Sequence, residues 1–254
     1  MDRALNDAVR AGDVAAAADA RLRGGMWSSS TTAIAAGAGH TACLTFLHTH
    51  GCPWNKWTCI HAAEDGAVAC LEYALAHGCP ADELAAQGAA YFGRYDALLT
   101  LYKYGVPWDA TACHMAARGG HLACLRLLHD LGCPWDERVA RQAVLADEGA
   151  VLHWARCNGC PWDAHLFEGV PPTRCTRCVP VAAYLGYPGA LPTANARDAA
   201  RLRLLPKLRA HVALRRIALY WQGCYLARAC GDGGALRAAD AAAFACDFGG
   251  GDAT

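Results

Sequence analysis

The sequence predicts an all-α solenoid of stacked helix-turn-helix repeats, closed by a helical C-terminal cap. Glycine recurs every 27 residues without a slip, at positions 24, 51, 78, 105, 132, 159 and 186. Four of these glycines open almost the same tetrapeptide, Gly-x-Pro-Trp, at Gly51, Gly105, Gly132 and Gly159. A fixed period of about 20 to 50 residues is typical of proteins built by stacking one structural unit.

The unit Trp108–Pro134 shows the expected elements most clearly. Asp109 is placed to cap a first helix over 110–118, a pair of glycines then breaks this helix, and a second helix is expected over 121–130. Gly132 should end the second helix with a positive φ, and the proline that follows prevents continuation. A single hairpin cannot bury the apolar faces of both helices, so neighbouring hairpins must cover them.

The same register holds at the expected core positions. An Ala-Ala pair in the first helix, a glycine between the helices and a leucine in the second helix all recur along the chain. We expect the alanines and leucines to form one continuous core between the hairpins. The pairs begin at Ala35, Ala62, Ala89 and Ala116, the glycines are Gly12, Gly39, Gly66 and Gly93, and the leucines are Leu44, Leu71, Leu98, Leu125 and Leu152.

The chain has fifteen cysteines, and ten of them occupy repeat positions. Equivalent positions of neighbouring repeats should lie about 10 Å apart, beyond the reach of a disulfide. We therefore interpret these cysteines as small buried hydrophobic residues in a reducing compartment. The N-terminal segment has no apolar signal core, and no stretch approaches about 18 uncharged apolar residues, so we expect an intracellular protein without a transmembrane segment.

Residues Thr111–Cys133 resemble the ankyrin repeat in their Ala-Ala, Gly-His and leucine positions. The resemblance covers residues 1 to about 188, although Ala112 replaces the usual proline and the unit is six residues shorter than an ankyrin repeat of about 33 residues. The missing residues belong where ankyrins place a β-hairpin. The Gly-Cys-Pro-Trp variants and the segment Ile217–Gly249 are similar to ankyrin-repeat proteins of giant DNA viruses of amoebae, such as pandoraviruses.

Three segments are expected along the chain: a solenoid of about seven units over 1–188, a basic helical cap over 189–230, and a loosely ordered tail over 231–254. The last two units look degenerate. Residues 197–228 carry eight basic residues against the single acid Asp198. A cap over the last repeat is the favoured interpretation of this segment, and contact with nucleic acid or an anionic membrane is the alternative.

Tryptophan follows the turn proline in most units, so we expect the rings to stack as a ladder under the connecting loops. An aromatic groove for a ligand or nucleic acid is the alternative. Packing is favoured because Ala81 and Gly189 interrupt the series. The ladder residues are Trp27, Trp54, Trp108, Trp135 and Trp162.

The resemblance to ankyrins implies that a partner binds the concave face formed by the first helices. Tyr91 and Phe92 stand at the centre of this face, where exposed aromatic side chains would suit an interface hot spot. Packing of one ring against the next repeat is the alternative. Transferred to this sequence, the exposed positions are His61, Glu64, Asp65, Tyr91, Phe92, Met115, Arg118 and Gln142.

Two CxxC pairs, Cys157/Cys160 and Cys175/Cys178, have nearly the spacing of a zinc ribbon. Against a metal site, Cys160 and Cys178 are already explained by the repeat register, so no metal or other cofactor is expected. No catalytic set emerges either, because the histidines match scaffold positions. His114 matches the ankyrin histidine that forms a hydrogen bond between repeats, as the resemblance implies.

We therefore expect a non-catalytic, monomeric protein-interaction module that binds a host or viral protein. Lysine plus arginine equals aspartate plus glutamate, at 23 each, so the whole chain has no charge bias toward nucleic acid or membrane. One alternative is a zinc-stabilised nucleic-acid-binding module that uses the CxxC pairs and the basic segment. Another is an adaptor that recruits a component of a ubiquitin ligase.

Overall fold

The computed structural model describes residues 3–162, 164–187, 189 and 191. The chain divides into two units, Met1–Pro206 and Lys207–Thr254, and the second unit lies wholly outside the described residues. The basic segment 197–228 and the tail 231–254 also lie outside them. None of the helices in the described part has the length and apolar character needed to span a bilayer.

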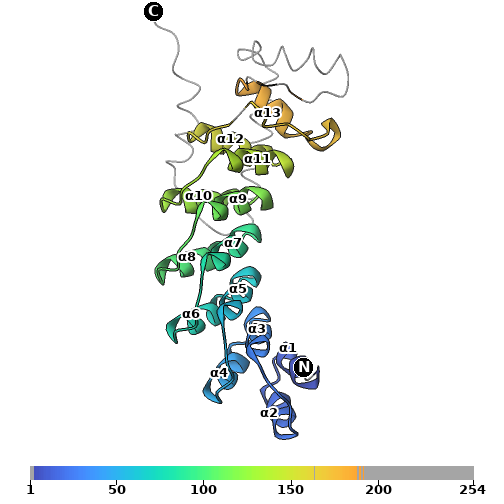
Figure 1. Cartoon of the computed structure of the whole chain (residues 1–254), viewed down its shortest axis with the longest axis vertical. Coiled ribbons are helices and arrows are strands. Elements are labelled where there is room, and N and C mark those ends of the chain that lie inside the picture. The colour runs from blue at the N-terminus through green and yellow to red at the C-terminus, as the bar shows by residue number, and fades with distance from the viewer. Residues whose placement is uncertain (1–2, 163, 188, 190, 192–254) are drawn as a thin grey trace, which may run out of the picture. The chain divides into compact units, whose positions relative to one another are not determined.

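The described residues are all-helical, as the sequence predicts, and contain no β-strand. Six helical hairpins follow one another, and a 3-10 helix and one further helix complete this part of the chain (Figure 1). The hairpins are α1 (Arg3–Ala11) with α2 (Val14–Leu22), α3 (Ser29–Gly37) with α4 (Thr41–Thr49), α5 (Lys56–Asp65) with α6 (Val68–Ala76), α7 (Glu83–Tyr91) with α8 (Tyr95–Lys103), α9 (Ala110–Gly119) with α10 (Leu122–Asp130), and α11 (Glu137–Leu145) with α12 (Gly149–Cys157), followed by η1 (Pro172–Arg174) and α13 (Cys178–Tyr184).

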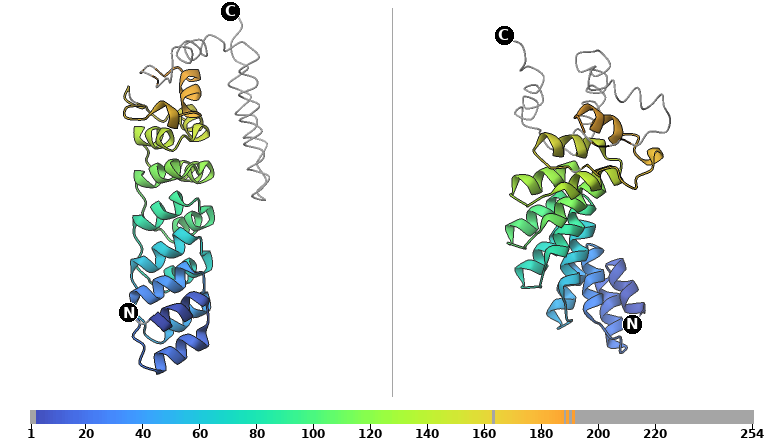
Figure 2. Two further views of the ribbon diagram at one scale, coloured as in Figure 1. Left: turned by 90° about the vertical axis from the view of Figure 1, so that its right-hand side faces the viewer. Right: turned by 45° about the horizontal axis from the view of Figure 1, so that its top comes forward.

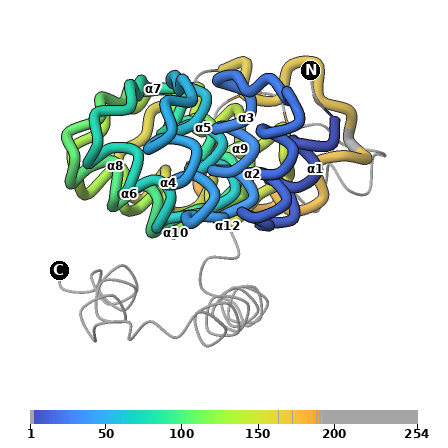
Figure 3. Tube along the Cα trace, turned by 90° about the horizontal axis from the view of Figure 1, so that it is seen from below, coloured from blue at the N-terminus to red at the C-terminus, as the bar shows by residue number. Residues whose placement is uncertain are grey.

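The hairpins stack so that the first helices form one row and the second helices form another (Figure 2). Figure 3, which looks along the stack, shows α3, α5 and α7 on one side and α4, α6 and α8 on the other. The predicted core positions are buried between these rows. The Ala-Ala pairs that begin at Ala35, Ala62, Ala89 and Ala116 are fully buried, as are Leu44, Leu71, Leu98, Leu125 and Leu152.

The ends of the helices follow from capping residues at repeat positions. The Asp109 carboxylate accepts a hydrogen bond from the backbone N–H of Thr111 at 3.1 Å, so it caps α9 as predicted. Gly132 has a φ of 78°, also as predicted. The break after α9 differs slightly from the prediction, because Gly119 still belongs to the helix and Gly120 alone takes the left-handed conformation.

The cysteine of the Gly-Cys-Pro turn closes its own hairpin. Its thiol donates a hydrogen bond to the backbone carbonyl of the residue that caps the first helix, 24 positions earlier. This cysteine clasp joins the end of the second helix to the start of the first. Within the described residues the clasps are Cys52 to Ser28 at 3.5 Å, Cys79 to Asn55 at 3.4 Å, Cys133 to Asp109 at 3.2 Å, and Cys160 to Asp136 at 3.4 Å.

The tryptophans of the turns act as wedges between successive second helices. Each packs on the side chain six positions earlier, and three of them also contact an aromatic ring 19 positions later. Among the described residues no two of the five are in ring contact, so the expected direct stacking is wrong. The earlier partners, at 3.9 to 5.4 Å, are Arg21, His48, Tyr102, His129 and Arg156, and the later ones, at 5.8 to 6.5 Å, are Phe46, Tyr73 and Trp154.

The expectation of two degenerate units is only half correct. The sixth hairpin, α11 with α12, is regular. In the seventh unit, turns and η1 stand in place of a first helix, as the adjacent prolines Pro171 and Pro172 predict. Asp147, where earlier units carry a glycine, has a φ of 55°, and its carboxylate accepts hydrogen bonds from the backbone N–H groups of Arg177 and Cys178. A side-chain cap thus joins α12 to the irregular unit.

Candidate protein-interaction surface

The outward positions of the first helices form what we call the first-helix face. None of its residues is buried, and their chemistry changes from hairpin to hairpin while the core alanines repeat. In chain order from α1 to α11, with three positions from each first helix, the face consists of Arg3, Asp7, Arg10; Ser30, Ile34, Gly37; Trp57, His61, Glu64; Leu84, Gly88, Tyr91; Thr111, Met115, Arg118; and Arg138, Gln142, Leu145. We call these eighteen residues the first-helix face below.

A groove of about 490 Å³ lies on this face over α3. It forms because α3 presents mostly small side chains, with Ile34 as the exception, whereas α5 beside it carries a tryptophan and a histidine. Ser30, Ala33 and Gly37 line it from α3, and Arg10 lines it from α1. The side chains of α1 and α5 therefore project further than those of α3 between them. The groove can accept a protruding side chain or a short peptide segment.

The wall on α5 is held by contacts within that helix. The rings of Trp57 and His61 stack with centroids 5.9 Å apart. His61 Nδ1 and Glu64 Oε2 are 3.2 Å apart. The Asp65 side chain extends over Gly37 of α3, since a Cβ on that glycine would lie 2.9 Å from a carboxylate oxygen of Asp65. His61 and Asp65, which the sequence predicted as partner-binding residues, both line the groove.

A second feature lies on α7 and α9, where Tyr91 of the face is followed by Phe92, the residue that caps α7. Tyr91 is 38% exposed and Phe92 is 48% exposed, and their rings meet edge to face with centroids 5.0 Å apart. The guanidinium of Arg118 lies 5.9 Å from the Tyr91 ring centre, so the neighbouring repeat contacts one ring without covering it. The pair thus makes a contact with the next repeat and still leaves both rings exposed.

The remaining predicted residues are spread along the face. Glu64 packs over α7, where a Cβ on Gly88 would lie 2.6 Å from its Cγ. Met115 on α9 and Gln142 on α11 are half-buried. The structure thus gathers the predicted residues into an α5 group and an α7–α9 group, with Gln142 apart from both.

Sequence reasoning missed three apolar residues of the face. Trp57 is 48% exposed, and Leu84 and Leu145 are exposed too. The signal for Trp57 was available, because it lies three residues after Trp54 and outside the 27-residue tryptophan register. A tryptophan that the repeat does not require is a candidate for function.

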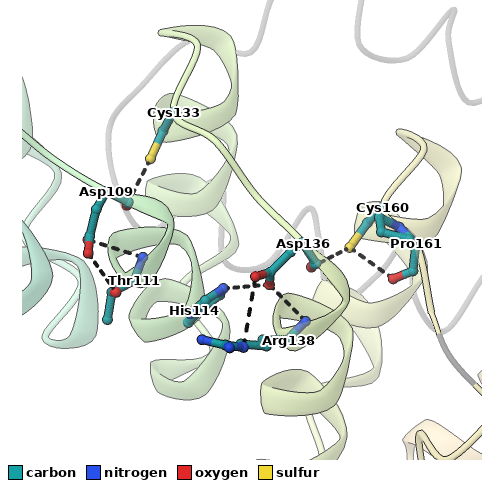
Figure 4. Close-up of polar contacts among 8 residues, drawn as sticks. All are labelled: Asp109, Thr111, His114, Cys133, Asp136, Arg138, Cys160 and Pro161. Carbon is teal, nitrogen blue, oxygen red and sulfur yellow. Dashed lines mark hydrogen bonds and ion pairs between the residues drawn. The ribbon is translucent and has the colours of Figure 1, made fainter.

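His114 belongs to the scaffold rather than to the face. Its Nε2 lies 2.7 Å from Oδ1 of Asp136, the residue that caps α11, and the ring is buried (Figure 4). Gln87, one repeat earlier, donates to Asp109 at 3.1 Å in the same way. These bonds join a first helix to the start of the next first helix, as the ankyrin resemblance implies for the histidine.

The four cysteines of the zinc hypothesis are not gathered into a metal site. The described residues contain no group of three or more His, Cys, Asp or Glu side chains placed to hold a metal ion. Cys157 is exposed, whereas the Cys160 thiol clasps Asp136 and the Cys178 thiol donates to the carbonyl of Ala143. Burial raises the pKa of Cys160 to about 11, which favours the neutral thiol over a metal-binding thiolate.

Comparison with known proteins supports the same fold. A family model described as ankyrin repeats in many copies matches residues 86–129. The structure is similar to the crystal structure of the human ASB11 ankyrin repeat domain, with a TM-score of 0.56 and 16% sequence identity, over 80% of this chain and 98% of that chain. A search of curated proteins found no match. The structural likeness establishes the fold of an ankyrin-type helical solenoid.

Proposed function

We propose that this chain is a non-catalytic protein-interaction module that binds a partner protein through the first-helix face. The observation that carries the proposal is the exposure of Trp57 and Tyr91 on neighbouring first helices, and of Phe92 at the end of α7, in an otherwise regular scaffold. Aromatic side chains dominate the binding energy of many interfaces. Ankyrin-type folds typically serve as interaction scaffolds, which supports the same conclusion.

The two features of the face suit different parts of one partner. The groove over α3 would accept a side chain between Arg10 and the α5 wall, and the Tyr91/Phe92 pair would pack against an apolar surface. Because the hairpins are held by clasps, caps and buried alanines, little conformational freedom would be lost on binding. We expect a monomer of the protein to bind the partner through this face.

The free thiols of the described residues support a site of action inside a cell, where cysteines stay reduced. The similarity of the Gly-Cys-Pro-Trp turns to those of giant-virus ankyrin proteins leads us to propose a host or viral protein as the partner. The segment that an adaptor or nucleic-acid-binding function would use, 197–228, lies outside the described residues, and no observation on the described residues favours those alternatives.

The experiment is affinity capture with the full chain, followed by affinity measurement on the purified captured protein. Trp57→Ala and the double variant Tyr91→Ala, Phe92→Ala are compared with Tyr104→Ala. Tyr104 is a matched control because it is also 38% exposed but lies at the end of α8, a second helix. We expect each face variant to weaken binding at least about tenfold, as for hot-spot residues. Equal affinity of all variants would refute binding through this face.

A further inference from the structure

Two of the cysteine clasps contain a second thiol. The first-helix position that faces the clasp, four residues after the helix cap, is occupied in successive hairpins by Thr32, Cys59, Ala86, Cys113 and Ala140. Only the hairpins of α5 and α9 therefore carry a cysteine at both positions. The pairs are Cys59 with Cys79 and Cys113 with Cys133, and the members of each pair are 20 residues apart in the sequence.

The two thiols of each pair are in contact. The Cys79 thiol bonds to the backbone carbonyl of Asn55 at 3.4 Å, one helical turn before Cys59, and the Cys133 thiol bonds to the carbonyl of Asp109 at 3.2 Å, one turn before Cys113. The two side chains of each pair also share a hydrogen bond. Cys59 and Cys113 are fully buried, while Cys79 and Cys133 keep 5% and 4% of their surface exposed at the turn. Each pair thus has an inner cysteine in the first helix and an outer cysteine at the turn.

The same hydrogen bond shifts the pKa values of the two thiols in opposite directions. The hydrogen bond from Cys59 lowers the pKa of Cys79, and the bond from Cys113 lowers the pKa of Cys133. The pKa values of Cys59 and Cys113 are raised by these hydrogen bonds and by burial. The outer thiol is consequently the one that ionises first, and it lies next to a second thiol that can attack it once its sulfur has been oxidised.

We propose that Cys59–Cys79 and Cys113–Cys133 are oxidation sites at which peroxide converts a clasp into a disulfide within one hairpin. The outer thiol loses its proton to solvent, and its sulfur attacks one oxygen of hydrogen peroxide. The O–O bond breaks to give a sulfenic acid and hydroxide, which takes up a proton to become water. The inner sulfur then attacks the sulfenic sulfur, forms the S–S bond and releases a second water. Two thiols lose two electrons and two protons, and one peroxide is reduced to two waters.

The disulfide would replace a hydrogen bond by a covalent link between the start of a first helix and the end of its second helix. The helices concerned are α5, which carries Trp57 and the groove wall, and α9, which carries Met115 and Arg118. Cross-linking of a loop restricts the unfolded chain, so the oxidised hairpins should unfold at higher temperature. This inference stands on the thiol contacts alone and does not depend on the proposed function.

The test treats the full folded chain with hydrogen peroxide, alkylates the remaining thiols after unfolding, and locates disulfides by peptide mass spectrometry. A Cys157→Ser background removes Cys157, the exposed cysteine among the described residues. We expect the two pairs to form disulfides while Cys52 and Cys160 remain thiols. These two are internal controls, because they form the same clasp opposite Thr32 and Ala140. Oxidation of Cys79 and Cys133 no faster than Cys52 and Cys160, or oxidation that stops at acids without S–S bonds, would overturn the proposal.

A double variant, Cys59→Ala with Cys113→Ala, provides the second measurement. Alanine stands at the equivalent positions Ala86 and Ala140, so the scaffold accepts it. Peroxide should raise the thermal unfolding midpoint of the parent by several degrees, a reducing dithiol should reverse the shift, and the double variant should show no rise. An equal response of the parent and the double variant would also rule the proposal out.

Discussion

His114 and Asp136 connect two repeats through a single short contact. Nε2 of His114 lies 2.7 Å from Oδ1 of Asp136, and the imidazole is buried. The Asp136 carboxylate also accepts a hydrogen bond from the backbone N–H of Arg138 at the start of α11. One carboxylate thus caps a helix and binds the preceding repeat. The seam between the fifth and sixth hairpins depends on it.

Replacing His114 by alanine should therefore destabilise this seam by about 1–3 kcal/mol, because a buried polar contact is lost and Asp136 is left with one partner fewer. Urea unfolding followed by circular dichroism measures the change. His50→Ala is the control, since His50 is exposed and its ring contacts Phe46 and Thr49 of its own helix. A His114 variant as stable as the His50 variant would contradict the role assigned to this contact.

Gly120→Ala should be more destabilising than Gly132→Ala. Both glycines have a φ between 75° and 78°, so each substitution has a similar backbone penalty of about 1–2 kcal/mol. Gly120 has an additional steric penalty, because a Cβ there would lie 2.6 Å from Cδ of Glu148, whereas open space surrounds Gly132. Equal losses in a denaturant series would show that Glu148 moves away freely.

The two kinds of tryptophan should respond differently to substitution. Trp135→Ala removes a wedge between α10 and α12 that contacts His129 and Trp154, so we expect a loss of about 2 kcal/mol or more. Trp57→Ala should change stability by less than about 1 kcal/mol, because the ring is 48% exposed on the face. Chemical denaturation of both variants tests the contrast, and a large loss for Trp57 would assign that residue to the scaffold.

Stability should fall in alkaline solution. Burial raises the pKa of Cys52 and Cys160 from an ordinary value of 9.0 to about 11. The folded state therefore keeps protons that the unfolded chain releases, so this stabilisation is complete below pH 9 and is lost as the pH rises toward 11.

Thermal unfolding at about pH 8 and about pH 10.5 would measure this loss. A double variant with valine at Cys52 and Cys160 is the control, because Val106 occupies the same turn position naturally. The unfolding midpoint of this variant should fall less than that of the parent. An equal fall would mean that other groups govern the alkaline response.

The repeat register made most of the scaffold predictable. Every expected Ala-Ala pair and leucine is buried, since one short pattern fixes both the period and the face of each helix. The cysteine clasp could not be predicted, because it joins atoms 24 residues apart and depends on how a hairpin closes. The direct stacking of tryptophans failed for a related reason: side chains of the second helices fill the space between successive turns.

The candidate face was predictable only in part. Its position followed from the first-helix register, and Tyr91 and Phe92 stood out as exceptions to the repeat. The groove could not be predicted in this way, because it arises from a difference in side-chain size between neighbouring helices. Gly37 and Ser30 on α3 lie beside Trp57 on α5. A comparison of equivalent positions for size, rather than for hydrophobicity, would have found it.

The cysteine clasp also bears on how such a chain changes its length. Because the thiol of Cys133 returns to Asp109 in the same hairpin, a 27-residue segment with a clasp carries its own closure, as four of the six described hairpins do. Unequal recombination that duplicates or removes one whole segment would leave every remaining closure intact. The number of hairpins is thus open to evolutionary change independently of their stability, and the binding face can lengthen or shorten one helix at a time.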